Sequence, residues 1–336
     1  MKLIQCLEPG QLIYTEAPIP ALTAGHTLLQ IKRIGICGTD IHAYDGTQPY
    51  FTYPRILGHE LAAEIVETTD PELHPGSKVT IIPYYACGTC IACRQQKPNC
   101  CSSIQVAGVH IDGGMKEFML VPNKAVIAGN DMTLDELALT EPLAISAHGI
   151  RRAAVKAGEQ VLIMGAGPIG LGAAAFALQA GATVIMLDVN QQRLAFCKDL
   201  FPEITIINVL GEDVTGEIAK ITNNEYCSVV IDASGNQQAI NNCLQYLAHG
   251  GRIVLIGLQK KELIYSHPEF HKRETTLMSS RNATVADFQY VMDCIREQKI
   301  SPLKMITHRA TFEEAVAAFP QWVRPENNVI KAMITL

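Results

Sequence analysis

The chain has 336 residues, of which 48% are hydrophobic and 18% are charged, a composition typical of a globular protein with two domains. Its formal net charge of −6 and its lack of a lysine- or arginine-rich run argue against a nucleic acid or an anionic membrane as a partner. The eleven cysteines follow an N-terminus without an apolar signal segment, so we expect a reducing, cytoplasmic location.

The first part of the chain, up to about Pro122, alternates short apolar segments with glycine and proline turns. Strands are expected at Thr27–Lys32 and Lys78–Ile82, among others. This texture predicts an irregular, mostly β domain, which we place at residues 1–141.

Two groups of potential metal ligands lie in this part of the chain. The spacing of Cys87, Cys90 and Cys93, followed by Cys100 and Cys101, can close four thiolates on one zinc ion. A site closed by four thiolates leaves no position for a substrate and therefore stabilises a loop. The residues alone leave Cys100 and Cys101 as alternatives for the fourth ligand.

The second group is dispersed over three short motifs, Cys37-Gly-Thr-Asp40-Ile-His42, Gly58-His59-Glu60 and Glu141-Pro142. A thiolate, an imidazole and a carboxylate would hold zinc and leave one position for water or substrate. Glu60 and Glu141 compete for the carboxylate position. Neighbouring residues of a strand face opposite sides, so Glu60 can join His59 on one metal only where the backbone bends.

After Pro142 apolar strands alternate with helices, which predicts a parallel, doubly wound α/β sheet in residues 142–277. From about Met278 the chain is expected to return to the first domain, so that residues 278–336 belong with 1–141. The expected elements are Gln160–Met164, Ile169–Ala180, Thr183–Leu187, Gln191–Leu200, Ser228–Ile231, Gln237–Leu247, Arg252–Ile256, a helix near Thr284–Gln298 and a closing strand Ile330–Leu336.

A glycine-rich turn follows the first strand of this sheet and opens a helix, where a pyrophosphate can bind. Asp188 ends the next strand and can accept hydrogen bonds from both ribose hydroxyls, while its charge would repel a 2′-phosphate. No arginine follows Asp188 before Arg193, so NAD is favoured over NADP. Later strand ends suggest two further contacts. The expected cofactor-binding residues are Gly165, Gly167, Pro168, Ile169, Gly170, Asp188, Arg193, Ser234 and Gly257.

Taken together, these motifs resemble those of the zinc-dependent medium-chain alcohol dehydrogenase family, in its polyol, sugar-acid and threonine dehydrogenase branch. The resemblance covers nearly the whole chain and implies a GroES-like catalytic domain beside the Rossmann domain. It also implies two zinc ions: a catalytic one on Cys37 and His59, with Glu60 as the resting ligand and Glu141 close by, and a structural one. The family's spacing selects Cys101 over Cys100 for the latter.

The resemblance further assigns roles in alcohol oxidation. Asp40 is expected to orient His59, and Thr39 with His42 to form a proton relay that includes the cofactor ribose. The family forms dimers and tetramers, so a homodimer or homotetramer is expected.

The resemblance implies several possible substrates. Residues 50–55 and 279–284 resemble segments of family members that oxidise hexonates such as gulonate or galactonate at carbon 5. Arg281 would then hold the acid group, unless it pairs with the cofactor pyrophosphate or with a surface carboxylate such as Asp287. Threonine and sorbitol-type dehydrogenases are alternatives within the family. A non-enzymatic alternative is an NAD-binding structural or sensor protein that holds only the structural zinc.

Overall fold

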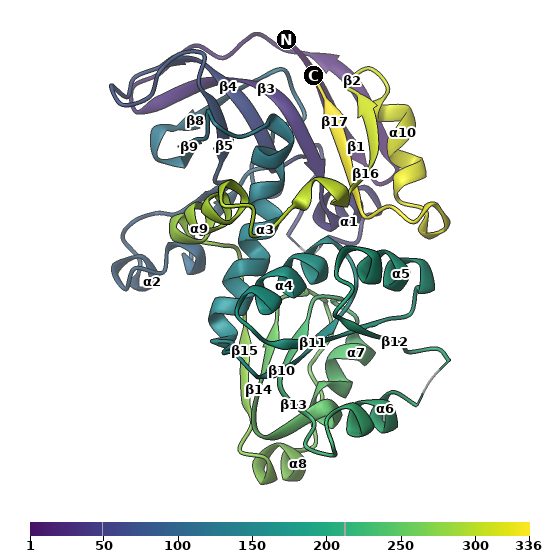
Figure 1. Cartoon of the computed structure of the whole chain (residues 1–336). Coiled ribbons are helices and arrows are strands. Elements are labelled where there is room, and N and C mark those ends of the chain that lie inside the picture. The colour runs from purple at the N-terminus through teal and green to yellow at the C-terminus, as the bar shows by residue number, and fades with distance from the viewer. Residues whose placement is uncertain (49, 212) are drawn as a thin grey trace. The chain divides into compact units, whose positions relative to one another are not determined.

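The computed structural model describes residues 1–48, 50–211 and 213–336. They form two compact units, Met1–Pro142 with Thr284–Leu336 and, between these segments, Leu143–Ala283 (Figure 1). The predicted fold class, a doubly wound parallel sheet and a mostly β domain, is confirmed.

The first unit is built around a seven-stranded sheet in which β16, β17, β3, β4, β5 and β9 are neighbours and β8 also pairs with β3. The C-terminal strand β17 pairs with β3 in antiparallel orientation, so the tail adds strands to the N-terminal sheet. The strands are β1 (Lys2–Glu8), β2 (Gln11–Glu16), β3 (His26–Ile36), β4 (Glu60–Thr68), β5 (Lys78–Ile81), β6 (Tyr84–Tyr85), β7 (Gln105–Val106), β8 (Phe118–Pro122), β9 (Val126–Ala128), β16 (Ile306–Thr311) and β17 (Lys331–Thr335).

Helices in this unit are short, apart from two. Thr284 caps α9, because the carboxylate of Asp287 accepts hydrogen bonds from both the Thr284 backbone N–H and its hydroxyl. Helix α3 contains Pro142, and the boundary between the two units falls at that residue. The helices are α1 (Gly38–Tyr44), α2 (Ile91–Arg94), α3 (Leu134–Ala153), α9 (Val285–Arg296) and α10 (Ala315–Trp322).

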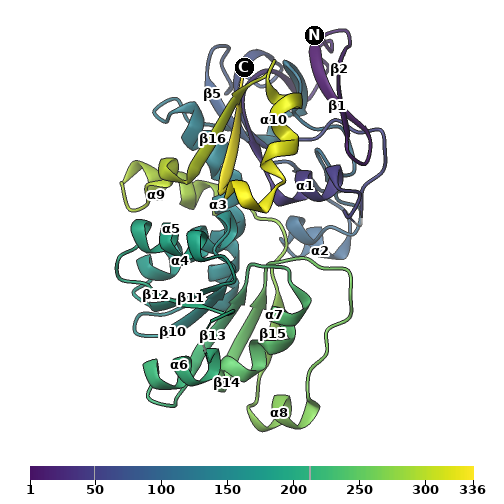
Figure 2. The ribbon, with the colours of Figure 1, turned by 90° about the vertical axis from the view of Figure 1, so that its right-hand side faces the viewer.

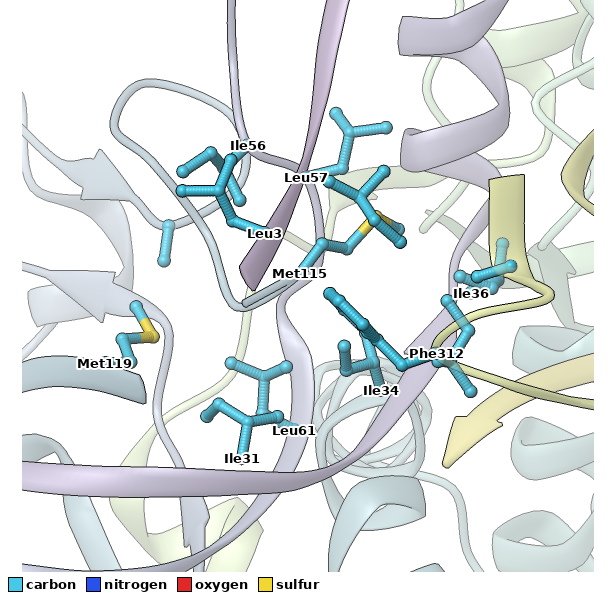
Figure 3. Close-up of a cluster of buried hydrophobic side chains, with 14 of the residues drawn as sticks. Leu3, Ile31, Ile34, Ile36, Ile56, Leu57, Leu61, Met115, Met119 and Phe312 are labelled. Atoms are coloured by element: carbon cyan, nitrogen blue, oxygen red, sulfur yellow. The ribbon is translucent and has the colours of Figure 1, made fainter. Parts of the chain in front are cut away.

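A large apolar core fixes the loop that carries the second group of ligands. Leu57 and Leu61 are fully buried in this core and flank the Gly58–Glu60 segment on both sides. Burying a leucine side chain contributes about 1.5–3 kcal/mol, so this loop has little freedom to move. Figure 3 shows the surrounding side chains, including Leu3, Ile31, Ile34, Ile36, Ile56, Met115, Met119 and Phe312.

The second unit contains a six-stranded parallel sheet in the order β12, β11, β10, β13, β14, β15. Helices α4 and α5 lie on one side of it and α6 on the other (Figure 2). Its elements are β10 (Gln160–Met164), α4 (Pro168–Gln179), β11 (Thr183–Asp188), α5 (Gln191–Leu200), β12 (Thr205–Asn208), α6 (Val214–Ile221), β13 (Cys227–Asp232), α7 (Gln237–Asn242), β14 (Leu247–Leu255), α8 (His267–Lys272) and β15 (Thr276–Ser279).

One predicted element of this sheet ends differently. The helix expected over Gln237–Leu247 stops at Asn242 and continues as a 3-10 turn over Cys243–Tyr246, and β14 begins at Leu247 instead of Arg252. The apolar residues of this stretch can be buried by either a helix or a strand. Composition alone therefore did not show where the helix ends and the strand begins. Among the described residues, no helix combines the length and the apolar character needed to span a membrane.

Arg252 and Glu159 form a part-buried ion pair at the amino end of the parallel sheet. The Arg252 guanidinium donates to both carboxylate oxygens of Glu159, at 2.9 and 2.6 Å, and also to the carbonyl oxygens of Ala153 and Ala154. These hydrogen bonds from Arg252 hold the pKa of Glu159 below its ordinary value of 4.5.

We expect Arg252→Met to lower the free energy of unfolding by about 2–4 kcal/mol at pH 7, because it leaves a part-buried carboxylate and two carbonyls without their donor. A carboxylate with a lowered pKa stabilises the fold above its unfolded value, so the difference between wild type and variant should shrink as the pH falls below about 4.5. Denaturant unfolding at several pH values measures it. Lys220→Met, which removes an exposed pair with Glu217, is the matched control and should change stability by about 0.5 kcal/mol at most.

Candidate active site

Three donor atoms of different chemistry converge in the first unit. The Cys37 sulfur, a His59 ring nitrogen and a Glu60 carboxylate oxygen all lie within 4.8 Å of one another. Cys37 is the N-cap of α1, His59 directly precedes β4, and Glu60 is the first residue of that strand. The backbone changes from loop to strand between His59 and Glu60. This change allows the two neighbouring side chains to converge with Cys37.

This donor set fits a zinc ion. One thiolate, one imidazole and one carboxylate are the ligand types of a catalytic zinc with an open position. His59 is 5% exposed, and its buried Nδ1 has no hydrogen-bond partner among the described residues. Burial would lower the pKa of His59, but the charges of Asp40 and Cys37 outweigh it and raise that pKa well above 6.5. The anionic groups around His59 therefore favour a cation at this point.

Asp40 connects the two segments that carry these donors. Its fully buried carboxylate accepts hydrogen bonds from the backbone N–H groups of Cys37, at 2.9 Å, and Gly58, at 3.1 Å. Its distance to the His59 Nδ1 atom is 3.8 Å, longer than a hydrogen bond. In this structure Asp40 therefore holds the backbone at Cys37 and next to His59. The hydrogen bond between Asp40 and the His59 ring, which we expected, is not formed.

Glu141 is buried close to this group but is not one of the three converging donors. The Tyr84 hydroxyl donates a hydrogen bond to its carboxylate. Burial, which outweighs the favourable charge of His59 and this hydrogen bond, raises the pKa of Glu141 to about 7. Tyr84 carries no sequence signal that pointed to this position.

The two residues of the expected proton relay lie on α1. Thr39 is half-buried and His42 is exposed, and the two are separated by one helical turn. The His42 Nδ1 atom lies 3.0 Å from the Thr47 hydroxyl, so its Nε2 atom can exchange a proton with solvent.

The four-cysteine group is also assembled. The sulfur atoms of Cys87, Cys90, Cys93 and Cys101 lie within 4.8 Å of one another, whereas Cys100 is exposed and outside the group. Zinc–sulfur bonds of about 2.3 Å require sulfurs about 3.8 Å apart, so small movements close a tetrahedral site. The hydroxyl and backbone N–H of Thr89 donate to Cys87 and lower its pKa to about 7, which favours the thiolate that binds metal.

In the second unit the glycine-rich turn lies between β10 and α4. Gly165 adopts a φ of +104°, and Gly167 is the N-cap of α4, with Pro168 in its first turn. The Asp188 carboxylate accepts from the backbone N–H of Ala166 at 2.7 Å, which fixes it at the carboxyl end of β11. Helix N-terminus, glycine turn and carboxylate thus meet at one edge of the sheet, as dinucleotide binding requires.

The remaining expected cofactor residues lie around the same edge. A Cβ atom on Gly167 would be 4.0 Å from the Arg193 guanidinium, and one on Gly165 would be 3.0 Å from the Ser234 backbone. Gly257 lies two residues after β14, and a Cβ atom there would be 2.2 Å from the Gly235 backbone nitrogen and 2.5 Å from the Asp232 carboxylate. Arg281 is exposed, two residues after β15.

Comparison with known proteins identifies the family of the chain. The family model described as "Alcohol dehydrogenase GroES-like domain" matches residues 23–131, and the one described as "Zinc-binding dehydrogenase" matches residues 168–297. The chain is 43% identical to an L-galactonate-5-dehydrogenase of Escherichia coli K12, over 100% of this chain and 99% of that protein. It belongs to the zinc-dependent medium-chain alcohol dehydrogenase family, and it is an oxidoreductase that uses zinc and a nicotinamide cofactor.

Solved structures of other dehydrogenases also resemble the whole chain. An alcohol dehydrogenase from E. coli CFT073 in complex with NADH is 29% identical, with a TM-score of 0.93 over 100% of this chain and 99% of that chain. A zinc-binding dehydrogenase from Sinorhizobium meliloti 1021 bound to NADP is 26% identical, with a TM-score of 0.92 and the same coverage. Relatives of this fold therefore bind either form of the cofactor.

One buried residue beside the metal ligands was not predicted from the sequence. Lys331 is 2% exposed, and its ammonium lies 2.6 Å from both carboxylate oxygens of Glu60. A signal for it existed in the closing strand, where Lys331 is the one charged residue among Ile330, Ala332, Met333 and Ile334. A lysine inside a buried strand needs an anionic partner, and that partner is the expected metal ligand.

Proposed function

We propose that this protein is an NAD-dependent zinc dehydrogenase that oxidises the hydroxyl at carbon 5 of a hexonic acid of the galactonate or gulonate type. The observation that carries the proposal is the convergence of Cys37, His59 and Glu60 in a chain 43% identical, along its full length, to an L-galactonate-5-dehydrogenase. These three residues would hold a zinc ion, which would supply a Lewis acid that lowers the pKa of a bound alcohol. The glycine-rich turn and Asp188 would hold the nicotinamide cofactor, which would supply the hydride acceptor.

The chain's own residues would supply binding, orientation and proton transfer. Thr39 and His42 would be two members of a proton relay that also includes the cofactor ribose. The Thr39 hydroxyl would accept the alcohol proton as it gives up its own, and the exposed His42 imidazole would release a proton to solvent. Asp40 keeps Cys37 and Gly58 in place through their backbone N–H groups. Tyr84 holds Glu141 nearby, where that carboxyl can accept a hydrogen bond from the substrate or from water.

A screen of substrates tests the proposal. The zinc-loaded enzyme is assayed by NADH formation with galactonate and gulonate, with the uncharged polyols galactitol and sorbitol, and with threonine. We expect kcat/KM for a hexonate to exceed that for either polyol by at least tenfold. A preference for sorbitol or threonine would contradict the hexonate assignment and leave the dehydrogenase assignment standing.

We propose that Arg281 binds the acid group of the substrate. We expect Arg281→Ala to raise KM for a hexonate tenfold or more, consistent with about 1.5–3 kcal/mol for a charge-assisted hydrogen bond, and Arg281→Lys to recover only part of it. Initial-rate kinetics measure this change, with KM for NAD and KM for sorbitol as internal controls. Loss of NAD affinity with unchanged hexonate affinity would show that Arg281 binds the cofactor instead.

The preference for NAD is assigned to Asp188. Replacing it by alanine removes the acceptor for the ribose hydroxyls and the repulsion of a 2′-phosphate, so we expect the ratio of NAD to NADP efficiency to fall at least tenfold. Steady-state kinetics with both cofactors measure it. Asp199→Ala, which removes the same charge from an exposed position on α5, should leave the ratio unchanged. A wild-type enzyme that prefers NADP would contradict this assignment.

The proposal includes one zinc on the three converging donors, a second on the four cysteines, a cytoplasmic location, and assembly as a homodimer or homotetramer. Sedimentation of the purified enzyme tests the assembly, and a monomer would contradict it.

A further inference from the structure

The Glu60 side chain crosses a neighbouring strand at a gap made by one glycine. Glu60 of β4 is paired with Gly35 of β3, and Met333 of β17 is paired with Gly35 on its other side. A Cβ atom on Gly35 would lie 2.2 Å from Glu60 Oε2 and 3.0 Å from the Glu60 Cβ atom. Only a glycine leaves room for the carboxylate to pass over β3 toward β17.

Lys331 receives the carboxylate on the far side of this gap. Its ammonium lies 2.6 Å from each Glu60 oxygen and donates a third hydrogen bond to the Ile36 carbonyl, at 3.1 Å. Ile36 directly precedes Cys37, so one buried ammonium joins the Glu60 side chain to the backbone beside the thiolate. Lys331 and Glu60 are 2% and 0% exposed, so no solvent competes for these contacts.

A carboxylate has about four lone-pair sites, so an ammonium on its two oxygens leaves sites for a metal. Glu141 has a different fixed partner, the Tyr84 hydroxyl. The two glutamates that compete for the metal are thus held by separate contacts.

We propose that Gly35 and Lys331 are positioning residues that hold the Glu60 carboxylate beside Cys37 and His59 and so make Glu60, instead of Glu141, the third protein ligand of the metal. This inference rests on the proposed function, because it assumes that the three donors bind zinc. It assigns a role to two residues that contact neither substrate nor cofactor in the proposed reaction.

The test compares metal retention in four full-length proteins. Wild type, Lys331→Met, Gly35→Ala and Gly38→Ala are loaded with zinc and then exposed to a chelator, and the zinc that remains is measured over time. Lys331→Met removes the ammonium and keeps the gap, whereas Gly35→Ala keeps the ammonium and fills the gap. Gly38→Ala is the matched control, because Gly38 also neighbours Cys37 but a Cβ atom there meets nothing within 4 Å.

We expect Lys331→Met and Gly35→Ala to lose one zinc at least tenfold faster than wild type while the zinc of the four-cysteine group stays bound. Gly38→Ala should behave as wild type. Cobalt substitution adds a spectroscopic readout, since the visible ligand-field bands of the site should change in the first two variants and not in the control.

Equal retention and unchanged cobalt spectra in Lys331→Met and Gly35→Ala would overturn the inference, as would an equal loss in Gly38→Ala. If Lys331→Met does not fold, Gly35→Ala decides, because it keeps both charges of the pair. A wild-type protein that binds only one zinc would instead refute the proposed function, so the two failures are distinguishable.

Discussion

His59→Ala is expected to slow turnover at least a hundredfold while the protein remains folded and still binds NADH. The imidazole is one of three converging donors, so its loss leaves a thiolate and a carboxylate, too few ligands to keep zinc in place. Without zinc the alcohol is not activated near neutral pH. Turnover with the best substrate of the screen, and NADH binding followed by fluorescence, measure the two properties.

The control for this prediction is His74→Ala, which removes an exposed imidazole elsewhere in the first unit. It should leave turnover and metal content unchanged. Near-normal turnover in His59→Ala would show that the catalytic metal site has been misassigned.

Gly170→Ala is expected to lower the free energy of unfolding by about 3 kcal/mol or more. A Cβ atom at this position would lie 1.8 Å from the Gly165 carbonyl oxygen, a backbone atom that cannot move without opening the turn between β10 and α4. Denaturant unfolding monitored by circular dichroism measures the loss.

Gly167→Ala separates packing from binding in the same motif. Its Cβ atom would have 4.0 Å to its nearest neighbour, the Arg193 guanidinium, so we expect a stability loss of only about 1 kcal/mol, from the N-cap position. The added methyl group would nevertheless obstruct the approach of the pyrophosphate and weaken NADH binding at least tenfold. Equal stability losses in the two variants would contradict the assignment of distinct roles to these glycines.

The sequence grouped the potential metal ligands better than it predicted the contacts that hold them in place. Cysteine spacing and the Gly58-His59-Glu60 motif were sufficient to group the donors, because metal ligands must be particular residue types. The bend that brings His59 and Glu60 to one side had to be assumed. The contacts of Asp40 with two backbone N–H groups, and of Lys331 with Glu60, depend on the pairing of strands distant in sequence, which no local pattern encodes.

The fold, too, was predicted from the sequence in part. The alternation of apolar strands and helices predicted the parallel sheet, because its strands are buried on both faces. Helix α3 was not predicted, since Pro142 normally marks a helix end, yet here it lies within twenty helical residues. At Pro142 the local preference for a helix end did not decide the structure. The same holds at Leu247, where β14 begins earlier than the local sequence indicated.

Zinc content of the purified protein tests the central claim most directly. We expect two zinc atoms per chain, one lost selectively in His59→Ala and one held by the four cysteines. One zinc per chain in the wild-type protein, unchanged by His59→Ala, would contradict it, because that zinc would then belong to the four cysteines and not to His59.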